Sequence, residues 1–323
     1  MPILVILLLA AIFILVKSAD LTLKSIHSLT RKFHVKAFVV SALVLAVATS
    51  LPELFIGLAA AFNGSPNLSL GNIFGANVAN LSLVAGIAAF VAGGVLVKEK
   101  IIIKEVILAG LAAIFPVILL LDGTLSRVDG AILLITYIIY TTSFFKLKFL
   151  EIGRHHINRK VVMRFIKNAE AMGIKSEKTF GHFLLGVVGL LFSSNLIVKF
   201  SSELAEISGI PIFVVGIVLL SIGTTLPELI LSVESLKKGQ SSIFFGNILG
   251  SLVVDSTLIL GLVALVSPIH DGNIQKYLIT LICFGVTFFF FWFFTKTKSK
   301  LDRSEAAFLL LIYVIFVFLV FKS

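Results

Sequence analysis

Two stretches of this chain share the pattern Thr-x-Leu-Pro-Glu-Leu, VATSLPELFIG at residues 47–57 and IGTTLPELILS at residues 222–232. Each places a proline and a glutamate in the middle of an otherwise apolar segment. A charged side chain at the centre of a membrane helix costs about 2.5–3.5 kcal/mol on insertion scales. A proline removes a backbone hydrogen bond and clashes with the carbonyl four residues back. Both penalties recur 175 residues apart, so the two positions call for a common explanation.

The composition of the chain indicates whether it folds in water or in a membrane. Of 323 residues, 58% are hydrophobic and only 14% are charged, well below the quarter or so that is usual in soluble domains. A membrane span needs about 20 predominantly apolar residues, and the apolar runs are continuous, as in helices, with no alternation of the kind found in barrels. We therefore predict an all-α membrane protein with ten transmembrane helices. The predicted spans are residues 2–16, 37–62, 68–97, 101–121, 128–147, 181–200, 210–236, 241–267, 274–294 and 304–321.

The net charge of +10 could suggest a nucleic-acid partner, but the placement of the charges indicates a membrane topology instead. The loops on one side of the ten predicted spans carry 23 of the 27 Lys and Arg residues. Because positively charged loops stay in the cytoplasm, we expect a multi-pass protein of the cell membrane with both termini outside and the basic loop 148–180 inside. That loop could also contact anionic lipid headgroups of the bilayer, although a role as a topology anchor is favoured. We expect no nucleic-acid partner, no cofactor and no obligate protein partner.

An internal repeat explains the paired stretches. The same offset of 175 places GNIFGANVAN (71–80) on GNILGSLVVD (246–255), and an offset of 176 places LSRVDGAILLITYIIY (125–140) on LDRSEAAFLLLIYVIF (301–316). Each half then contains five helices, and an odd number forces the two halves into opposite orientations. This predicts two inverted five-helix repeats, residues 1–147 and 181–323, joined by the loop 148–180. In secondary transporters of this architecture the ion site lies near the bilayer midplane.

The repeated prolines are predicted to supply oxygen ligands. Pro52 and Pro227 break their helices, which is tolerated at membrane depth only where the freed backbone groups are buried in protein or line a wet cavity. Thr49 and Thr224 each share a helix face with the glutamate four residues on. Hydroxyl, carbonyl and carboxylate oxygens therefore gather at one level in each half.

The neighbouring helices are predicted to pack closely against this level. Gly71 with Gly75, and Gly246 with Gly250, form GxxxG pairs of the kind that allow close backbone approach. The approach would bring the last residue of each GN stretch, Asn80 or Asp255, up to the glutamates.

The acidic groups indicate a cation site. No Lys or Arg lies in the segments that carry Glu53, Asn80, Glu228 and Asp255, so a bound cation or protons must compensate their charge. The ligands are all oxygens, which favours hard ions such as Ca²⁺, Na⁺ or Mg²⁺. Ca²⁺ accepts six to eight oxygens in loose geometry and suits two opposed glutamates better than Mg²⁺ does. The alternative, that these residues only pack helices or bind water, does not explain a matched pair.

These motifs resemble the two α-repeats of the calcium/cation antiporter superfamily, and especially those of its sodium/calcium exchanger branch. TSLPEL and TTLPEL, each followed by GN and a GxxxG-type helix, carry the resemblance, which covers the whole chain. It implies Na⁺/Ca²⁺ exchange by alternating access, with helices 1 and 6 moving against the core. It also implies the metal ligands. The carboxylates of Glu53 and Glu228 and the backbone carbonyls of Thr49 and Thr224 would bind Ca²⁺, and oxygens of Ser50, Thr225 and Ser251 would bind Na⁺. Asn80 and Asp255 would flank the glutamates, and backbone oxygens near Ala46 and Ser221 would line the outer sites.

One departure and three rival functions stay open. Ala76 stands where the second half has Ser251 and where the family usually has serine, so one Na⁺ site could lack a ligand. A Ca²⁺/H⁺ antiporter has the same architecture, although its acidic motif usually reads like GNATEL. A cation channel usually builds its pore from a ring of subunits or repeats. An intramembrane enzyme using Ser251 and Asp255 would lack a His or Lys base, so we expect no enzymatic activity.

Overall fold

The computed structural model describes residues 2–30, 45–97, 100–152, 177–270, 275–297 and 300–322. Within these ranges, eight helices are long and apolar enough to cross a membrane, and Leu51–Phe62 is a shorter apolar helix. The eight helices coincide with eight of the ten predicted spans. Of the other two, the span 37–62 begins outside the described residues and the span 128–147 falls within a helix that begins at Arg127. The chain is thus an all-helical, multi-pass integral membrane protein, and the count of ten stays a prediction.

The elements of the two halves begin at equivalent positions. The first half contains α1 (Pro2–Thr30), α3 (Leu51–Phe62), α4 (Pro66–Ala79), η1 (Asn80–Val84), α5 (Ala85–Ala92), β1 (Val95–Leu96), α6 (Lys100–Leu119), η2 (Leu120–Asp122), β2 (Thr124–Leu125) and α7 (Arg127–Ile152). The second contains α9 (Glu177–Ser208), α10 (Ile212–Val215), η3 (Gly216–Leu220), α11 (Ser221–Thr224), α12 (Leu226–Lys237), α13 (Ser241–Val253), η4 (Val254–Ile259), α14 (Leu260–Val266), β3 (Ile269–His270), α15 (Gln275–Thr297), β4 (Lys300–Leu301) and α16 (Arg303–Lys322). Leu51 and Leu226, which start α3 and α12, are again 175 residues apart.

The two repeated prolines interrupt their helices, as the sequence predicts. The residues before α3 and α12 leave helical geometry, with Ser50 at φ −79°, ψ 9° and Thr225 at φ −80°, ψ 0°. In both helices the proline follows in the first turn, where its missing N–H removes no intrahelical bond. Each interrupted segment thus turns at the residue between the threonine and the Leu-Pro-Glu sequence.

The predicted close approach of the glycine pair holds in the first half. A Cβ added at Gly71 would collide with the backbone carbonyl of Phe213, and one added at Gly75 would collide with the carbonyl of Ile217. Backbone of α4 therefore lies directly against α10 and η3 of the other half. The positions equivalent to Phe213 and Ile217 are 38 and 42, which lie outside the described residues, as does most of the predicted loop 148–180.

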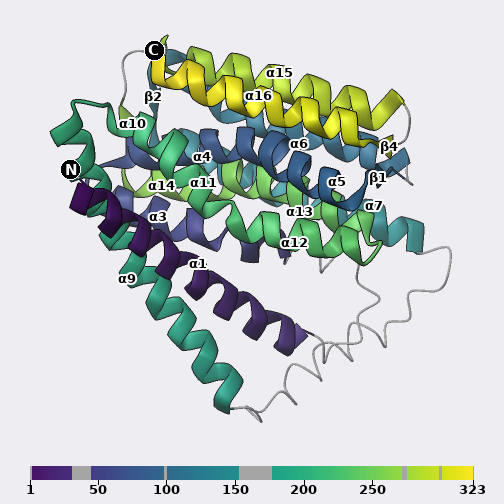
Figure 1. Cartoon of the computed structure of the whole chain (residues 1–323), viewed down its shortest axis with the longest axis horizontal. Helices are drawn as coiled ribbons and strands as arrows, with labels where there is room; N and C mark the ends of the chain where they lie inside the picture. The colour runs from purple at the N-terminus through teal and green to yellow at the C-terminus, as the bar shows by residue number, and fades with distance from the viewer. Residues whose placement is uncertain are drawn as a thin grey trace.

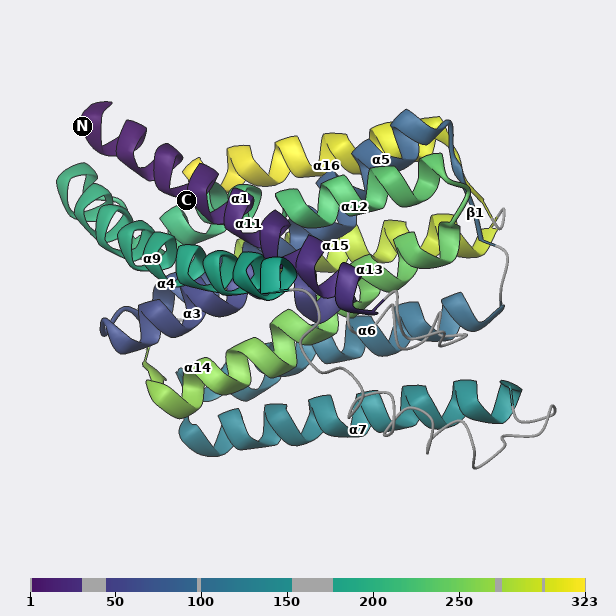
Figure 2. The ribbon, with the colours of Figure 1, turned by 90° about the horizontal axis from the view of Figure 1, so that it is seen from below.

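Two helices lie obliquely across one side of the bundle. Helices α1 and α9 run side by side and diverge from the other helices (Figures 1 and 2). Buried apolar side chains form two clusters, a large one through the main bundle and a smaller one where α1 and α9 meet α3. The pair α1 and α9 is thus packed mainly through its own hydrophobic interface.

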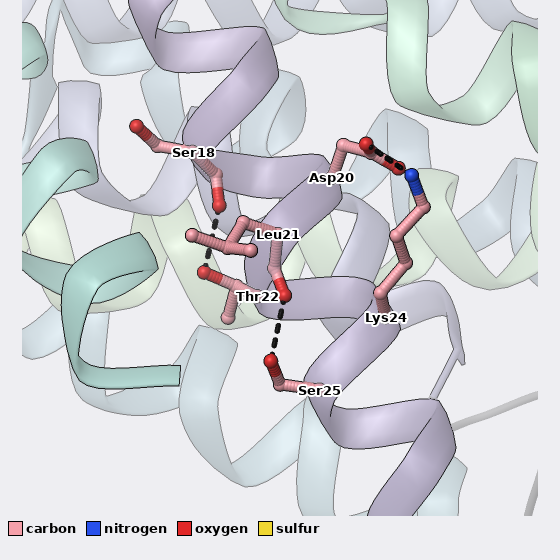
Figure 3. Close-up of polar contacts among 6 residues, drawn as sticks. All are labelled: Ser18, Asp20, Leu21, Thr22, Lys24 and Ser25. Carbon is pink, nitrogen blue, oxygen red and sulfur yellow. Dashed lines mark hydrogen bonds and ion pairs between the residues drawn. The ribbon is translucent and has the colours of Figure 1, made fainter. Parts of the chain in front are cut away.

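The polar side chains of α1 sort by face. The hydroxyl of Thr22 donates to the carbonyl of Ser18 at 2.8 Å, whereas Asp20 and Lys24 form an exposed ion pair at 2.7 Å (Figure 3). Ser18 packs directly on Gly189 of α9, where a Cβ would collide with its hydroxyl. Small residues therefore let the two oblique helices touch along one line.

Two short sheets join the halves. Strand β1 pairs antiparallel with β4, and β2 pairs antiparallel with β3. Each sheet takes one strand from each half, and the sheets lie at opposite ends of the bundle in Figure 1. Strands at equivalent sequence positions, such as β1 and β3, are thus found at opposite ends.

Candidate cation site

All nine residues predicted as ligands are described and deeply buried. Each has a relative exposure of 1% or less. They come from the turns before α3 and α12, from those two helices, and from the neighbouring α13, η1 and η4. These residues are Thr49, Ser50, Glu53, Asn80, Thr224, Thr225, Glu228, Ser251 and Asp255.

A chain of contacts crosses from the first half to Glu228. The hydroxyl oxygen of Thr49 lies 3.4 Å from that of Ser251, and the Ser251 hydroxyl donates to the Glu228 carboxylate at 3.5 Å. The Thr49 hydroxyl also donates to the side-chain oxygen of Asn247 at 3.1 Å. The turn before α3 therefore contacts the glutamate of the other half.

The opposite crossing repeats part of this pattern. The Thr224 hydroxyl donates to the side-chain oxygen of Asn72 at 3.3 Å, and Thr224 lies beside the carboxylate of Glu53. Asn72 and Asn247 are 175 residues apart, as are the two threonines, so the Thr–Asn contact occurs twice. Ala76, the counterpart of Ser251, is fully buried and offers no hydroxyl.

The carboxylates are close enough to interact, and most of their oxygens accept no hydrogen bond from the described residues. Glu53 interacts electrostatically with both Glu228 and Asp255, and Ser50 lies beside Asp255. Among the described residues, five of the six oxygens of these three carboxylates have no hydrogen-bond partner, and neither do the Ser50 hydroxyl and the Asn80 side-chain oxygen. A buried charge without a partner is strongly unfavourable. The oxygens are thus arranged for a positive partner.

The three acids alone do not form a metal cage. In the described part of the chain, no group of three or more His, Cys, Asp or Glu residues converges closely enough to hold a metal ion. A cation in this region would therefore take hydroxyl, amide and carbonyl oxygens as well as carboxylates, which is the mixed ligand set that Ca²⁺ and Na⁺ accept.

Local π-helical turns place the flanking groups. Asn80 begins the π-helical turn η1, and Asp255 is the second residue of the equivalent turn η4. A π-turn contains one more residue than an α-turn and so rotates the following side chains, and such turns occur frequently at functional sites. Nothing in the sequence pattern signals these turns.

Sequence reasoning also missed three buried side chains beside the predicted ligands. Asn72 and Asn247 bond the two threonines, and Ser232 bonds Asn247 at 3.2 Å. The asparagines stand in the repeated GN dipeptide, whose exact match at the offset of 175 was the available signal. The sequence alone assigned roles to the glycines of these stretches and to their last residues, Asn80 and Asp255, but not to Asn72 and Asn247.

Comparison with known families identifies the family of the chain. The sequence model of a family described as sodium/calcium exchanger protein matches residues 3–146 and 178–322. This chain belongs to that family. The family resemblance expected from TSLPEL and TTLPEL is confirmed, and Na⁺/Ca²⁺ antiport is the function that the membership supports. The family consists of transporters.

Named relatives span nearly the full length of this exchanger-family chain. The sodium/calcium exchanger MaX1 of Methanosarcina acetivorans is 27% identical, with 98% of this chain and 97% of the relative covered. An uncharacterized membrane protein of Methanocaldococcus jannaschii is 28% identical over 89% of this chain and 88% of its own length. A solved structure of the sodium-calcium exchanger NCX_Mj, soaked with Na⁺ and Sr²⁺, has a TM-score of 0.64 at 27% identity and 98% coverage of both chains.

Proposed function

We propose that this protein exchanges Na⁺ for Ca²⁺ across the membrane by alternating access, with Glu53 and Glu228 as the central carboxylates of one shared site. The observation that carries the proposal is the set of buried carboxylate oxygens, where the two interrupted helices meet, that have no hydrogen-bond partner among the described residues. Family membership and the ions named for NCX_Mj support the same ion pair.

Competition for the carboxylates accounts for exchange. Like charges held close together cannot all stay ionised without compensation, so the site needs Ca²⁺, several Na⁺ or protons at every stage. In the proposal, Thr49 and Thr224 offer backbone carbonyls to Ca²⁺, and Ser50, Thr225 and Ser251 offer oxygens to Na⁺. Asn80 and Asp255 flank the pair. An empty charged site disfavours the occluded state, so one ion leaves only as another enters.

The proposed architecture is a pair of inverted five-helix repeats within ten transmembrane helices. Equivalent elements start at an offset of 174 to 176, and the equivalent strands β1 and β3 lie at opposite ends of the bundle. Both facts support opposite orientations of the two halves. Together with the positive loops they support both termini outside and loop 148–180 in the cytoplasm.

The moving part in this proposal is the pair α1 and α9. These helices have their own apolar interface, and Ile12 of α1 packs directly on Gly223, next to Thr224. A slide of α1 and α9 over α3 and α12 would uncover one end of the site and cover the other. The rest of the bundle would keep the ligands in place.

A Ca²⁺/H⁺ antiporter is the second candidate. The buried Ala76 favours it, because an alanine in place of a serine removes one hydroxyl from a Na⁺ site. Against it, the acids follow Ser-Leu-Pro and Thr-Leu-Pro, the sequences by which the chain resembles the exchanger branch, and not a GNATEL-like motif.

The deciding experiment is ⁴⁵Ca²⁺ uptake into proteoliposomes that contain the purified protein. Vesicles preloaded with Na⁺ are compared with vesicles that carry only a pH gradient, each clamped at zero membrane potential. We expect uptake that requires internal Na⁺. Uptake driven by the pH gradient and indifferent to Na⁺ would establish the H⁺ alternative, and voltage-driven currents without counterflow would indicate a channel.

A further inference from the structure

The amide of Asn247 is held on three sides. Its nitrogen donates to the backbone carbonyl of Glu228 at 3.3 Å and to the hydroxyl of Ser232 at 3.2 Å, and its oxygen accepts from Thr49 at 3.1 Å. A carbonyl oxygen can only accept, so the nitrogen must face Glu228 and the oxygen must face Thr49. Asn247 is fully buried, and its contacts join the interrupted helices of the two halves.

The equivalent amide of Asn72 has less support. Its oxygen accepts from Thr224 at 3.3 Å, but its nitrogen is buried and has no hydrogen-bond partner in the described part of the chain. The position equivalent to Ser232 is Gly57, which has no hydroxyl. The orientation of this amide is therefore fixed from one side only.

We infer that Asn247 is a positioning residue that holds Thr49 and the Glu228 backbone in register, whereas Asn72 leaves Thr224 less constrained. The inference rests on the proposed function, because it assigns Asn247 a role in shaping that site. Among the described residues, Asn247 has no hydrogen bond to a carboxylate, so it acts through the Thr49 hydroxyl and the Glu228 backbone carbonyl.

The acceptor of the Thr49 hydroxyl proton links the Asn247 contact to cation binding. The hydroxyl lies 3.1 Å from the Asn247 oxygen and 3.1 Å from the backbone carbonyl of Ala46. A hydroxyl has one proton to donate. With Asn247 in place, that proton is shared, and the Ala46 carbonyl keeps lone-pair capacity for a cation. Without Asn247, the proton is left to the Ala46 carbonyl or the Ser251 hydroxyl, and Thr49 keeps only its 3.4 Å contact with Ser251 as a link to α13.

The test compares Asn247→Ala with Asn72→Ala in the same proteoliposome assay, measuring the KM for Ca²⁺, the KM for Na⁺ and the maximal rate. Loss of one buried hydrogen-bonding group corresponds to about a tenfold change in an equilibrium constant. We expect Asn247→Ala to raise both KM values by about that factor, and Asn72→Ala to raise them less than about threefold because Asn72 makes fewer bonds.

Two variants of Ser232 separate positioning from packing. Ser232→Ala removes one of the three bonds to Asn247 and should raise the KM values, but by less than Asn247→Ala does. Ser232→Thr keeps the hydroxyl and should leave the KM values close to those of the wild-type protein. A purely structural role would lower the amount of folded protein and the maximal rate while leaving KM unchanged.

The outcomes are distinguishable from a failure of the proposed function. If the wild-type protein shows no Na⁺-dependent Ca²⁺ uptake, the proposed function is wrong, and the same variants are compared by the Ca²⁺ concentration that protects the detergent-solubilised protein from thermal unfolding. In either assay, equal effects of Asn72→Ala and Asn247→Ala, or unchanged Ca²⁺ dependence in both, would overturn the inference.

Discussion

The two halves of the site follow the same backbone pattern but offer different oxygens. At several pairs of equivalent positions, the first half holds a neutral group or lacks a hydroxyl where the second half holds an acid or a hydroxyl. These pairs include Ala46 and Ser221, Gly57 and Ser232, Ala76 and Ser251, and Asn80 and Asp255. The repeat thus preserves helix breaks and close approaches, which need backbone geometry, while its ligands have diverged.

This difference predicts that the two central glutamates depend on bound ions to different extents. Glu228 receives a hydrogen bond from Ser251, whereas both oxygens of Glu53 have no partner among the described residues. A carboxylate with no donor has all its lone pairs available to a cation. We therefore expect Glu53 to depend more strongly on bound ions, and Glu228 to be held by protein as well.

The largest effect is expected where the halves are alike. Glu53→Gln or Glu228→Gln removes a central carboxylate charge and should lower ⁴⁵Ca²⁺ exchange more than 100-fold, on the order of 3 kcal/mol or more for a group on a buried cation. The check is Na⁺-dependent uptake normalised to the amount of protein in the vesicles. Near-normal exchange in either variant would contradict the assignment of a shared site.

The next largest effect concerns the shared backbone. Gly75→Ala puts a Cβ into the carbonyl of Ile217, and overpacking of this kind costs roughly 1–3 kcal/mol. If the two halves have the same backbone packing, Gly250→Ala should destabilise the protein as much as Gly75→Ala does. The measurement is the thermal unfolding midpoint in detergent, with Gly181→Ala as the control, since a Cβ there meets nothing within 4 Å. A difference between Gly75→Ala and Gly250→Ala would mean that the symmetry of packing is incomplete.

A smaller effect is expected from making the second half resemble the first. Asp255→Asn removes one acid while keeping the shape of the side chain, and we expect the KM for Ca²⁺ to rise about tenfold, as for one lost charge-assisted contact. The matched variant carries both Asn80→Asp and Asp255→Asn, which restores the number of acids. Recovery in the double variant would mean that the charge matters more than the half that carries it.

The smallest effect is expected from making the first half resemble the second. Ala76→Ser supplies the hydroxyl that Ser251 supplies opposite, and should lower the KM for Na⁺ by about two- to threefold, the size of one modest hydrogen-bond-like contact. Ser251→Ala removes the equivalent hydroxyl and should raise the KM for Na⁺. An unchanged Na⁺ dependence in both would remove these positions from the Na⁺ site.

Much of the fold could be predicted from residue patterns. Hydropathy located the spans, and the offset of 175 anticipated helix breaks at equivalent positions in the two halves, because Pro52 and Pro227 each disrupt the helix that precedes them. The count of ten was harder to test, since one predicted span begins before residue 45.

The site could be predicted only in part. The acids could be identified by their energetic cost in an apolar segment, and the threonines by their spacing of four residues from the glutamates. Asn72, Asn247 and Ser232 did not, because an amide or hydroxyl in a helix carries little penalty by itself and its role depends on a partner from the other half. The π-helical turns at Asn80 and Asp255 likewise arise from packing.

The strand pairs between the halves have a consequence for how the protein can be divided. At each end of the bundle, a strand of one half pairs with a strand of the other half: β1 pairs with β4, and β2 pairs with β3. In the proposed inverted arrangement, two separate five-helix chains would make the same contacts twice across a two-fold axis, as an isologous dimer does. A chain cut within the loop 148–180 should therefore assemble when both pieces are made together, whereas either piece alone would leave its strand edges open.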